Sequence, residues 1–189
     1  MRTVPGWALV SSAAAPVLLI GGWRLAAMRQ PGSFDPVSQT ISALAGRGAT
    51  DRWIMTAALA GVGVCHTLTA AGLRPAAGAG RALLATGGLA TLVLAAFPQP
   101  VRGSSAVHVG AASLALSALS LWPALAVWRH PASLVRHGFQ AATAVLLGLL
   151  GWFGAEYLRS GPRMGQAERV VTGAQALWPV VAVLLARRR

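Results

Sequence analysis

Six long apolar runs, separated by polar stretches, constrain the fold of this chain more than any other feature. None of the runs contains Lys or Asp, and Glu156 is their only acidic residue. Each run is apolar all round a helix instead of along one stripe, which is typical of burial in a bilayer. The sequence therefore predicts an all-α, single-domain bundle of six transmembrane spans. The runs lie at residues 7–23, 53–73, 82–97, 105–127, 139–158 and 170–186.

The composition excludes several other classes of protein. Apolar residues make up 55% of the chain and charged residues only 11%, whereas a soluble domain carries roughly 25% charged residues. This rules out an ordinary soluble enzyme and a disordered chain, and the single cysteine, Cys65, rules out a disulfide scaffold. The first run continues past the alanines at 13–15, so we interpret it as an uncleaved span and not as a signal peptide.

All sixteen basic residues are Arg, against four acidic residues, which gives a net charge of +12. The arginines stand singly or in pairs at the ends of the apolar runs, where their heads reach lipid phosphates. We therefore expect membrane lipids, and not nucleic acid, as partners, and the sequence says nothing of protein partners. The Arg-only, Ala-rich usage favours a bacterial plasma membrane.

The first connection, residues 24–52, is the longest and carries signals of a helix. Asp35 is a plausible N-cap followed by proline, and Gly46 suits a C-terminal stop. We expect a short amphipathic helix that lies at the membrane interface or folds back over the bundle. Its apolar residues fall on one face: Val37, Ile41 and Leu44.

The positive-inside rule does not decide the orientation, because the arginines divide equally between the two sides. The dense cluster at residues 187–189 favours an orientation with both termini cytoplasmic. In that orientation the inner face is purely basic and would bind anionic headgroups, and all four acidic residues lie on or near the outer side.

Span 170–186 and the residues before it carry a polar stripe. Glu168, Thr172, Gln175 and Pro179 follow one another at spacings of four, three and four, so they share one helical face. The stripe is either a polar track or headgroup pocket, or a set of residues such as Thr172 and Gln175 that hydrogen-bond across helices. The serines of span 105–127 are interpreted as packing residues.

A polar cluster on the outer side is the candidate functional site. Glu168, Asp35 and His108 are its candidate catalytic groups, since paired carboxylates beside a histidine can perform acid/base work or hold a headgroup. In the alternative interpretation, Glu168 and Arg169 merely cap the last span and pair with neighbouring charges. The cluster comprises Asp35, Ser38, Gln39, Ser42, His108, Glu156, Tyr157, Glu168 and Arg169.

The four histidines do not predict a metal or haem site, and we expect no cofactor. His66 lies about 20 Å below the outer end of its span and His108 about 5 Å below the end of its own, at 1.5 Å per residue. A difference of about 15 Å is too large for two ligands of one ion, whose bonds are about 2 Å long. His130 and His137 have no cysteine or carboxylate at ligand spacing.

The tripeptide Leu-Trp-Pro occurs at residues 121–123 and again at 177–179. It could mark a weak internal repeat, as transporter folds often have. A transporter built this way would have two halves that superpose about a pseudo-twofold axis.

Several short motifs follow one another along the chain, at residues 35–44, 72–75, 96–100, 103, 108, 121–123, 168–169 and 177–179. Their order resembles that of bacterial membrane proteins of the domain-of-unknown-function 998 family. The resemblance covers nearly the whole chain and implies a six-span membrane protein with no assigned activity, cofactor or catalytic residues.

Three functional hypotheses remain. The first is a membrane protein that engages lipid at the outer polar cluster and anionic headgroups at its basic inner face. The second is an interfacial enzyme that acts on a lipid or isoprenoid substrate, and the third is a small-solute or proton-coupled transporter.

Overall fold

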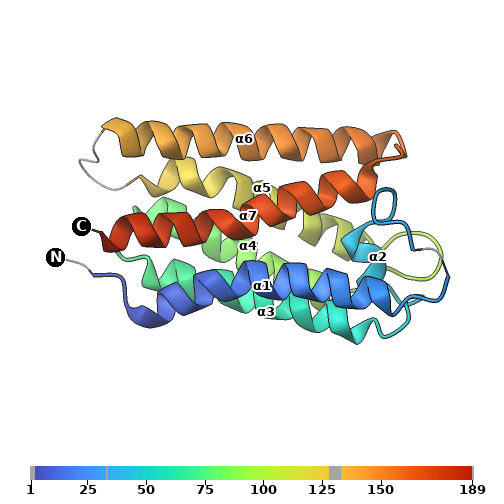
Figure 1. Ribbon diagram of the computed structural model, residues 1–189. Helices are drawn as coiled ribbons and strands as arrows, with labels where there is room; N and C mark the ends of the chain where they lie inside the picture. The colour runs from blue at the N-terminus through green and yellow to red at the C-terminus, as the bar shows by residue number, and fades with distance from the viewer. Residues whose placement is uncertain (1–2, 33, 128–132, 189) are drawn as a thin grey trace.

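A computed structural model describes residues 3–32, 34–127 and 133–188, with the side chains of 133 and 134 excepted. Within these ranges the chain forms seven α-helices and no β-strand (Figure 1). Their order along the chain is α1 (Gly6–Met28), α2 (Ile41–Ala45), α3 (Trp53–Gly72), α4 (Gly78–Ala96), α5 (Ala106–Ala126), α6 (Ser133–Leu158) and α7 (Met164–Arg187).

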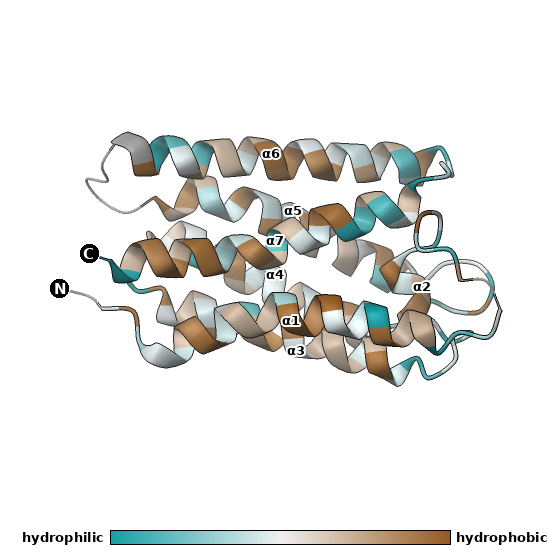
Figure 2. Ribbon diagram, in the orientation of Figure 1, coloured by the Kyte–Doolittle hydropathy of each residue, from teal (hydrophilic) through white to brown (hydrophobic). Residues whose placement is uncertain are grey.

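The six long helices are long and apolar enough to cross a membrane, which confirms the predicted all-α bundle of six spans. They contain between 19 and 26 residues, or about 28–39 Å at 1.5 Å per residue. The hydrocarbon core of a bilayer is about 30 Å thick. Figure 2 places the hydrophilic segments mainly at the helix ends and in the connections.

Four helices extend beyond the apolar runs that predicted them. α4 begins four residues early, α6 and α7 begin six residues early, and α1 continues for five residues after its run. The helices are longer than the apolar runs there, because charged residues such as Arg81 and Glu168 belong to the helices themselves. Hydropathy reports where the hydrocarbon begins, whereas backbone hydrogen bonding continues into the polar interface.

The long helices form a ring in chain order. Each packs against the next, and α1 packs against α7 to close the ring. The connections between consecutive helices from α3 to α7 are short, which makes these helices neighbours. Figure 1 places both chain termini at one end of the bundle, the terminal end, and α2 at the other, the α2 end. All four acidic residues belong to connections or helix turns at the α2 end.

The expected short helix exists, but it begins later than predicted. The N-cap of α2 is Thr40 and not Asp35. The Thr40 hydroxyl accepts a hydrogen bond from the Ala43 N–H at 3.1 Å. Asp35 instead closes a separate turn through hydrogen bonds to residues 37 and 38. Gly46 is the C-cap, as expected. Because Ile41 and Leu44 are buried against the bundle, α2 folds back over the ring.

Both Leu-Trp-Pro tripeptides lie within helices, and their tryptophans contact the same residue, Phe139. Trp122 of α5 and Trp178 of α7 each contact the ring of Phe139 edge to face, with ring centroids 6.4 Å and 5.5 Å apart. Phe139 and Trp122 are fully buried. These contacts join α5, α6 and α7, the three helices that complete the ring.

Candidate functional site

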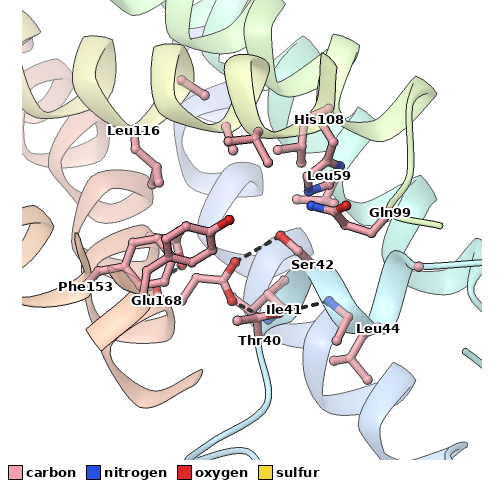
Figure 3. Close-up of a pocket in the computed structure, with 18 of the residues that line it drawn as sticks. Thr40, Ile41, Ser42, Leu44, Leu59, Gln99, His108, Leu116, Phe153 and Glu168 are labelled. Atoms are coloured by element: carbon pink, nitrogen blue, oxygen red, sulfur yellow. Dashed lines mark hydrogen bonds between the residues drawn. The ribbon is translucent and has the colours of Figure 1, made fainter. Parts of the chain in front are cut away.

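A cavity of about 800 Å³ lies inside the ring and reaches the α2 end; we call it the central cavity. All six long helices contribute to its wall, together with α2 and the connections beside it. Most of the lining side chains are apolar, and a smaller number are polar. The volume falls within the roughly 300–1,000 Å³ that is common for small-molecule sites. In Figure 3, Glu168 and Ser42 lie on one side of the cavity and His108 and Gln99 on another.

Glu168 projects from the second turn of α7 and is 7% exposed. Its carboxylate accepts hydrogen bonds from the backbone N–H of Ile41 and from Ser42 Oγ, the latter at 3.1 Å (Figure 3). The N–H of Ile41 opens α2 and therefore has no partner within that helix. Glu168 thus fixes α2 to α7, whereas the simpler sequence interpretation assigned it to the end of its own helix.

Arg169 fixes the segment before α2 onto the same helix. One guanidinium nitrogen donates to the carbonyl oxygens of Pro36 and Gln39, each at 2.7 Å, and to that of Gly165 at 2.9 Å. The guanidinium carbon lies 5.6 Å from the centroid of the Phe34 ring. Arg169 therefore donates hydrogen bonds to carbonyl groups and faces an aromatic ring, while the carboxylates of Glu168 and Asp35 attract it through their charge.

Asp35 and Ser38 lie on the outside of this segment. The Asp35 carboxylate accepts hydrogen bonds from Ser38 Oγ and from the N–H groups of Val37 and Ser38. The Ser38 hydroxyl, followed by the Val37 N–H, holds the pKa of Asp35 below its ordinary value. Neither Asp35 nor Ser38 is among the residues that line the cavity, whereas Gln39 and Ser42 are.

Of the two predicted cluster residues on α6, Tyr157 lines the cavity and Glu156 does not. Glu156 accepts a hydrogen bond from the Arg163 N–H at 2.9 Å, so it stabilises the connection between α6 and α7. Tyr157 is half exposed and lines the cavity. Of the three candidate catalytic groups, Glu168 and His108 thus share the cavity wall, and Asp35 does not.

Deeper in the ring, Gln175 joins α7 to α5. Its Nε2 donates to the Leu116 carbonyl at 2.8 Å and to Ser120 Oγ at 2.9 Å. Thr172 donates to the Glu168 carbonyl of its own helix at 2.7 Å. The sequence left open whether these residues hydrogen-bond across helices or line a pocket. Gln175 does both, and Thr172 bonds within its helix while lining the cavity.

Two of the histidines are buried in the cavity wall. His108 Nδ1 lies 2.9 Å from the Phe97 carbonyl oxygen, and His66 lies on α3. His137 is exposed on α6, and His130 lies outside the described residues. Among the residues that the structure describes, no group of three or more His, Cys, Asp or Glu side chains could hold a metal ion.

Sequence reasoning missed several residues that build this site. Gln99 lines the cavity and its Oε1 accepts from the Ser105 N–H at 3.0 Å, while its carbonyl accepts from the Arg47 N–H at 2.9 Å. Phe34 faces Arg169, and Thr40 caps α2. Only Thr40 carried a usable signal, since threonine before an apolar run is a common N-cap.

These features define the class of the protein: a multi-span membrane protein whose helices form a ring around a cavity. Its family follows from comparison with known proteins. The chain belongs to a family of proteins of unknown function (DUF998), whose model matches residues 13–185. The resemblance noted in the sequence is therefore confirmed. Neither the curated proteins nor the solved structures contain a match to the chain.

Proposed function

We propose that the protein binds a membrane lipid in its central cavity, where polar side chains of the wall hold the polar end of the lipid. The observation that carries this proposal is the cavity itself, which combines apolar walls with a limited set of polar side chains. Ligand sites have this composition, because apolar walls bury the ligand and a few polar groups fix its orientation. Glu168, Ser42 and Gln39 supply such groups beside α2.

The packing of α6 supports entry of the lipid from the bilayer. In the most apolar stretch of α6 only 11% of the residues are buried, against 33–50% in the corresponding stretches of the other five long helices. Ser113 and Ser117 of α5 and Tyr157 of α6 line the cavity and are nonetheless exposed. An opening between α5 and α6 would let a lipid chain remain in the bilayer while its polar end occupies the cavity.

We further propose that both termini are cytoplasmic and that the basic terminal end attracts anionic headgroups. Arg74, Arg81, Arg136, Arg187 and Arg188 belong to this end, whereas Arg2, Arg129 and Arg189 lie outside the described residues. Each exposed Arg near an anionic surface contributes about 1 kcal/mol to binding. Reconstituted protein should retain anionic lipids preferentially, and retention independent of lipid charge would contradict this part of the proposal.

A pair of glycine substitutions on α6 tests lipid binding in the cavity. Gly154 lines the cavity, and a Cβ added there would meet no described atom within 4 Å. Gly148 is equally open but does not line the cavity, so it is the matched control. Gly154→Leu should fill the space and remove most of the lipid that copurifies in detergent, as measured by mass spectrometry of the extract. Gly148→Leu should retain this lipid, and equal lipid content in the two variants would contradict the proposal.

A second candidate function is an interfacial enzyme that acts on a lipid. It is favoured by one observation, that Glu168 and His108 line the same cavity. Gln at position 168 keeps an oxygen that can accept from Ile41 but cannot act as a base. Glu168→Gln should therefore abolish turnover of the copurified lipid that mass spectrometry identifies, without a large change in thermal stability. Unchanged turnover would exclude Glu168 as a catalytic group.

A further inference from the structure

Two buried hydrogen-bond acceptors in the cavity wall have no partner in the described part of the protein. They are His108 Nε2 and Gln175 Oε1, on side chains that are 2% and 1% exposed. Both residues line the central cavity. A buried polar atom without a partner costs about 1–3 kcal/mol, so each such atom calls for a partner, and a ligand in the cavity can supply it.

The tautomer of His108 follows from its other nitrogen. Nδ1 lies 2.9 Å from the Phe97 carbonyl oxygen, which can only accept, so Nδ1 carries the proton. In the neutral ring Nε2 is then an acceptor. The orientation of the Gln175 amide follows in the same way, because its Nε2 donates to Leu116 and Ser120. Its Oε1, an acceptor, is then the atom without a partner. Both sites therefore require a donor from the ligand.

The charges around the cavity point in the same direction. The chain contains sixteen basic residues, all Arg, yet none of those that the structure describes lines the cavity. The one carboxylate in the described wall is Glu168. A phosphate or carboxylate ligand would meet acceptors and a carboxylate with no cation among the described lining residues to offset its desolvation, which is costly in a low-dielectric site.

We infer that the ligand is an uncharged lipid with a hydroxyl group, which donates its hydrogen to His108 Nε2 or Gln175 Oε1. His66 Nδ1 is a third buried atom of the same wall that lacks a partner among the described residues, and a hydroxyl can bond to it instead, because a hydroxyl both donates and accepts. The inference rests on the proposed lipid-binding function and narrows it to long-chain alcohols and related neutral lipids.

Probes that share one chain and differ at one end test the inference. Radiolabelled hexadecanol is bound to the purified protein in detergent, with the Gly154→Leu variant as the background for partition into micelles. It is then displaced by unlabelled hexadecanol, hexadecyl methyl ether, hexadecylamine, hexadecanoate or hexadecyl phosphate. Hexadecanol should compete at least roughly tenfold better than the ether, which cannot donate, and than both anions.

Each other outcome has a definite meaning. An ether that competes as well as the alcohol overturns the requirement for a donor, and a preference for the amine or for either anion overturns the uncharged ligand. In both cases lipid binding itself survives, provided that Gly154→Leu lacks the site. Failure of the proposed function looks different: no probe is retained above the Gly154→Leu background.

A histidine variant supplies a second test within the same assay. His66 makes no side-chain hydrogen bond to the described residues, so His66→Phe removes the ring nitrogens without breaking such a bond. It should weaken hexadecanol binding roughly tenfold and leave the binding of the ether unchanged. His137→Phe, on the exposed face of α6, is the control and should bind as the wild type does. Equal losses for alcohol and ether in His66→Phe would indicate a packing role, and no loss for the alcohol would place the hydroxyl at another atom; either result overturns the contribution of His66.

Discussion

The carboxylate of Glu168 accepts a hydrogen bond from Ser42 Oγ at 3.1 Å, although 126 residues separate the two in the chain. The same carboxylate accepts from the Ile41 N–H, so the first turn of α2 depends on a group supplied by α7. Since α7 also packs on α1, the contact ties the longest connection of the chain to the point where the ring closes. The wall of the central cavity at the α2 end is therefore a product of tertiary contacts.

Removing the carboxylate should destabilise this end of the protein. Glu168→Ala leaves the Ile41 N–H without a partner, and we expect a loss of about 1–3 kcal/mol in the free energy of unfolding. Ser42→Ala should cost only about 0.5–1.5 kcal/mol, because it removes one hydroxyl donor. Unfolding in detergent, followed by circular dichroism, measures both. In a double-mutant cycle the two effects should not add, and strict additivity would mean that the two side chains do not interact.

Gly165 of α7 is required because the segment before α2 passes very close to it. A Cβ at this position would lie 2.1 Å from the Gln39 carbonyl oxygen and 2.8 Å from that of Pro36, both of which are backbone atoms. Gly165→Ala should displace the segment that Arg169 holds and lower stability by about 1–3 kcal/mol. Gly148→Ala has open space and should be neutral or slightly stabilising, since alanine favours helices. Equal thermal midpoints for the two variants would contradict the close approach.

Asp35 should stabilise the folded protein at neutral pH and lose this effect in acid. Its pKa is held below the ordinary 3.8, chiefly by the Ser38 hydroxyl. A carboxyl group with a lowered folded-state pKa contributes stability above its unfolded-state pKa, and this contribution is lost as pH falls through the folded-state value. Asp35→Asn should therefore have a lower thermal midpoint than the wild type at neutral pH. The difference should shrink as the pH falls below about 4, and a constant difference from pH 3 to pH 6 would contradict this role.

The sequence was sufficient for the spans, because hydrophobicity is a local property that each run carries by itself. It also placed Glu168, Thr172 and Gln175 on one helical face, because helical periodicity is equally local. The start of α2 was predicted incorrectly for a physical reason. Asp35 has the chemistry of an N-cap, but its carboxylate is occupied by the turn that contains Ser38, and Thr40 caps the helix instead.

The partners of the polar residues could not be predicted, because they belong to distant segments. The predicted outer cluster grouped Glu168 and Arg169 with Ser42 and Gln39, but nothing in the sequence indicates which of these residues bond to one another. The histidines make the same point. Their different depths argued against one shared metal ion, but a cavity of about 800 Å³ can contact both without equal depth. Which atoms lack partners is visible only once every neighbour is placed.

The ring of Phe139 should be the main anchor of α6 at the end away from α2. It is fully buried and contacts the indoles of Trp122 and Trp178 edge to face. Phe139→Ala should cost about 3–5 kcal/mol and alter the tryptophan fluorescence. Phe97→Ala is the matched control, because that ring is half exposed and should cost far less. A thermal midpoint for Phe139→Ala no lower than that of Phe97→Ala would exclude the anchor.

The proposed orientation predicts which connections a membrane-impermeant thiol reagent reaches in intact cells. Cys65 is buried and is the one cysteine of the chain, so Cys65→Ala provides a background without thiols. Arg102→Cys, in the connection at the α2 end, should be labelled from outside. Arg74→Cys, in the connection at the terminal end, should be labelled only after the cells are permeabilised, because an even number of spans places it on the side of the termini. The reverse pattern would place the termini outside, and labelling of both sites in intact cells would contradict the crossing of α4 between them.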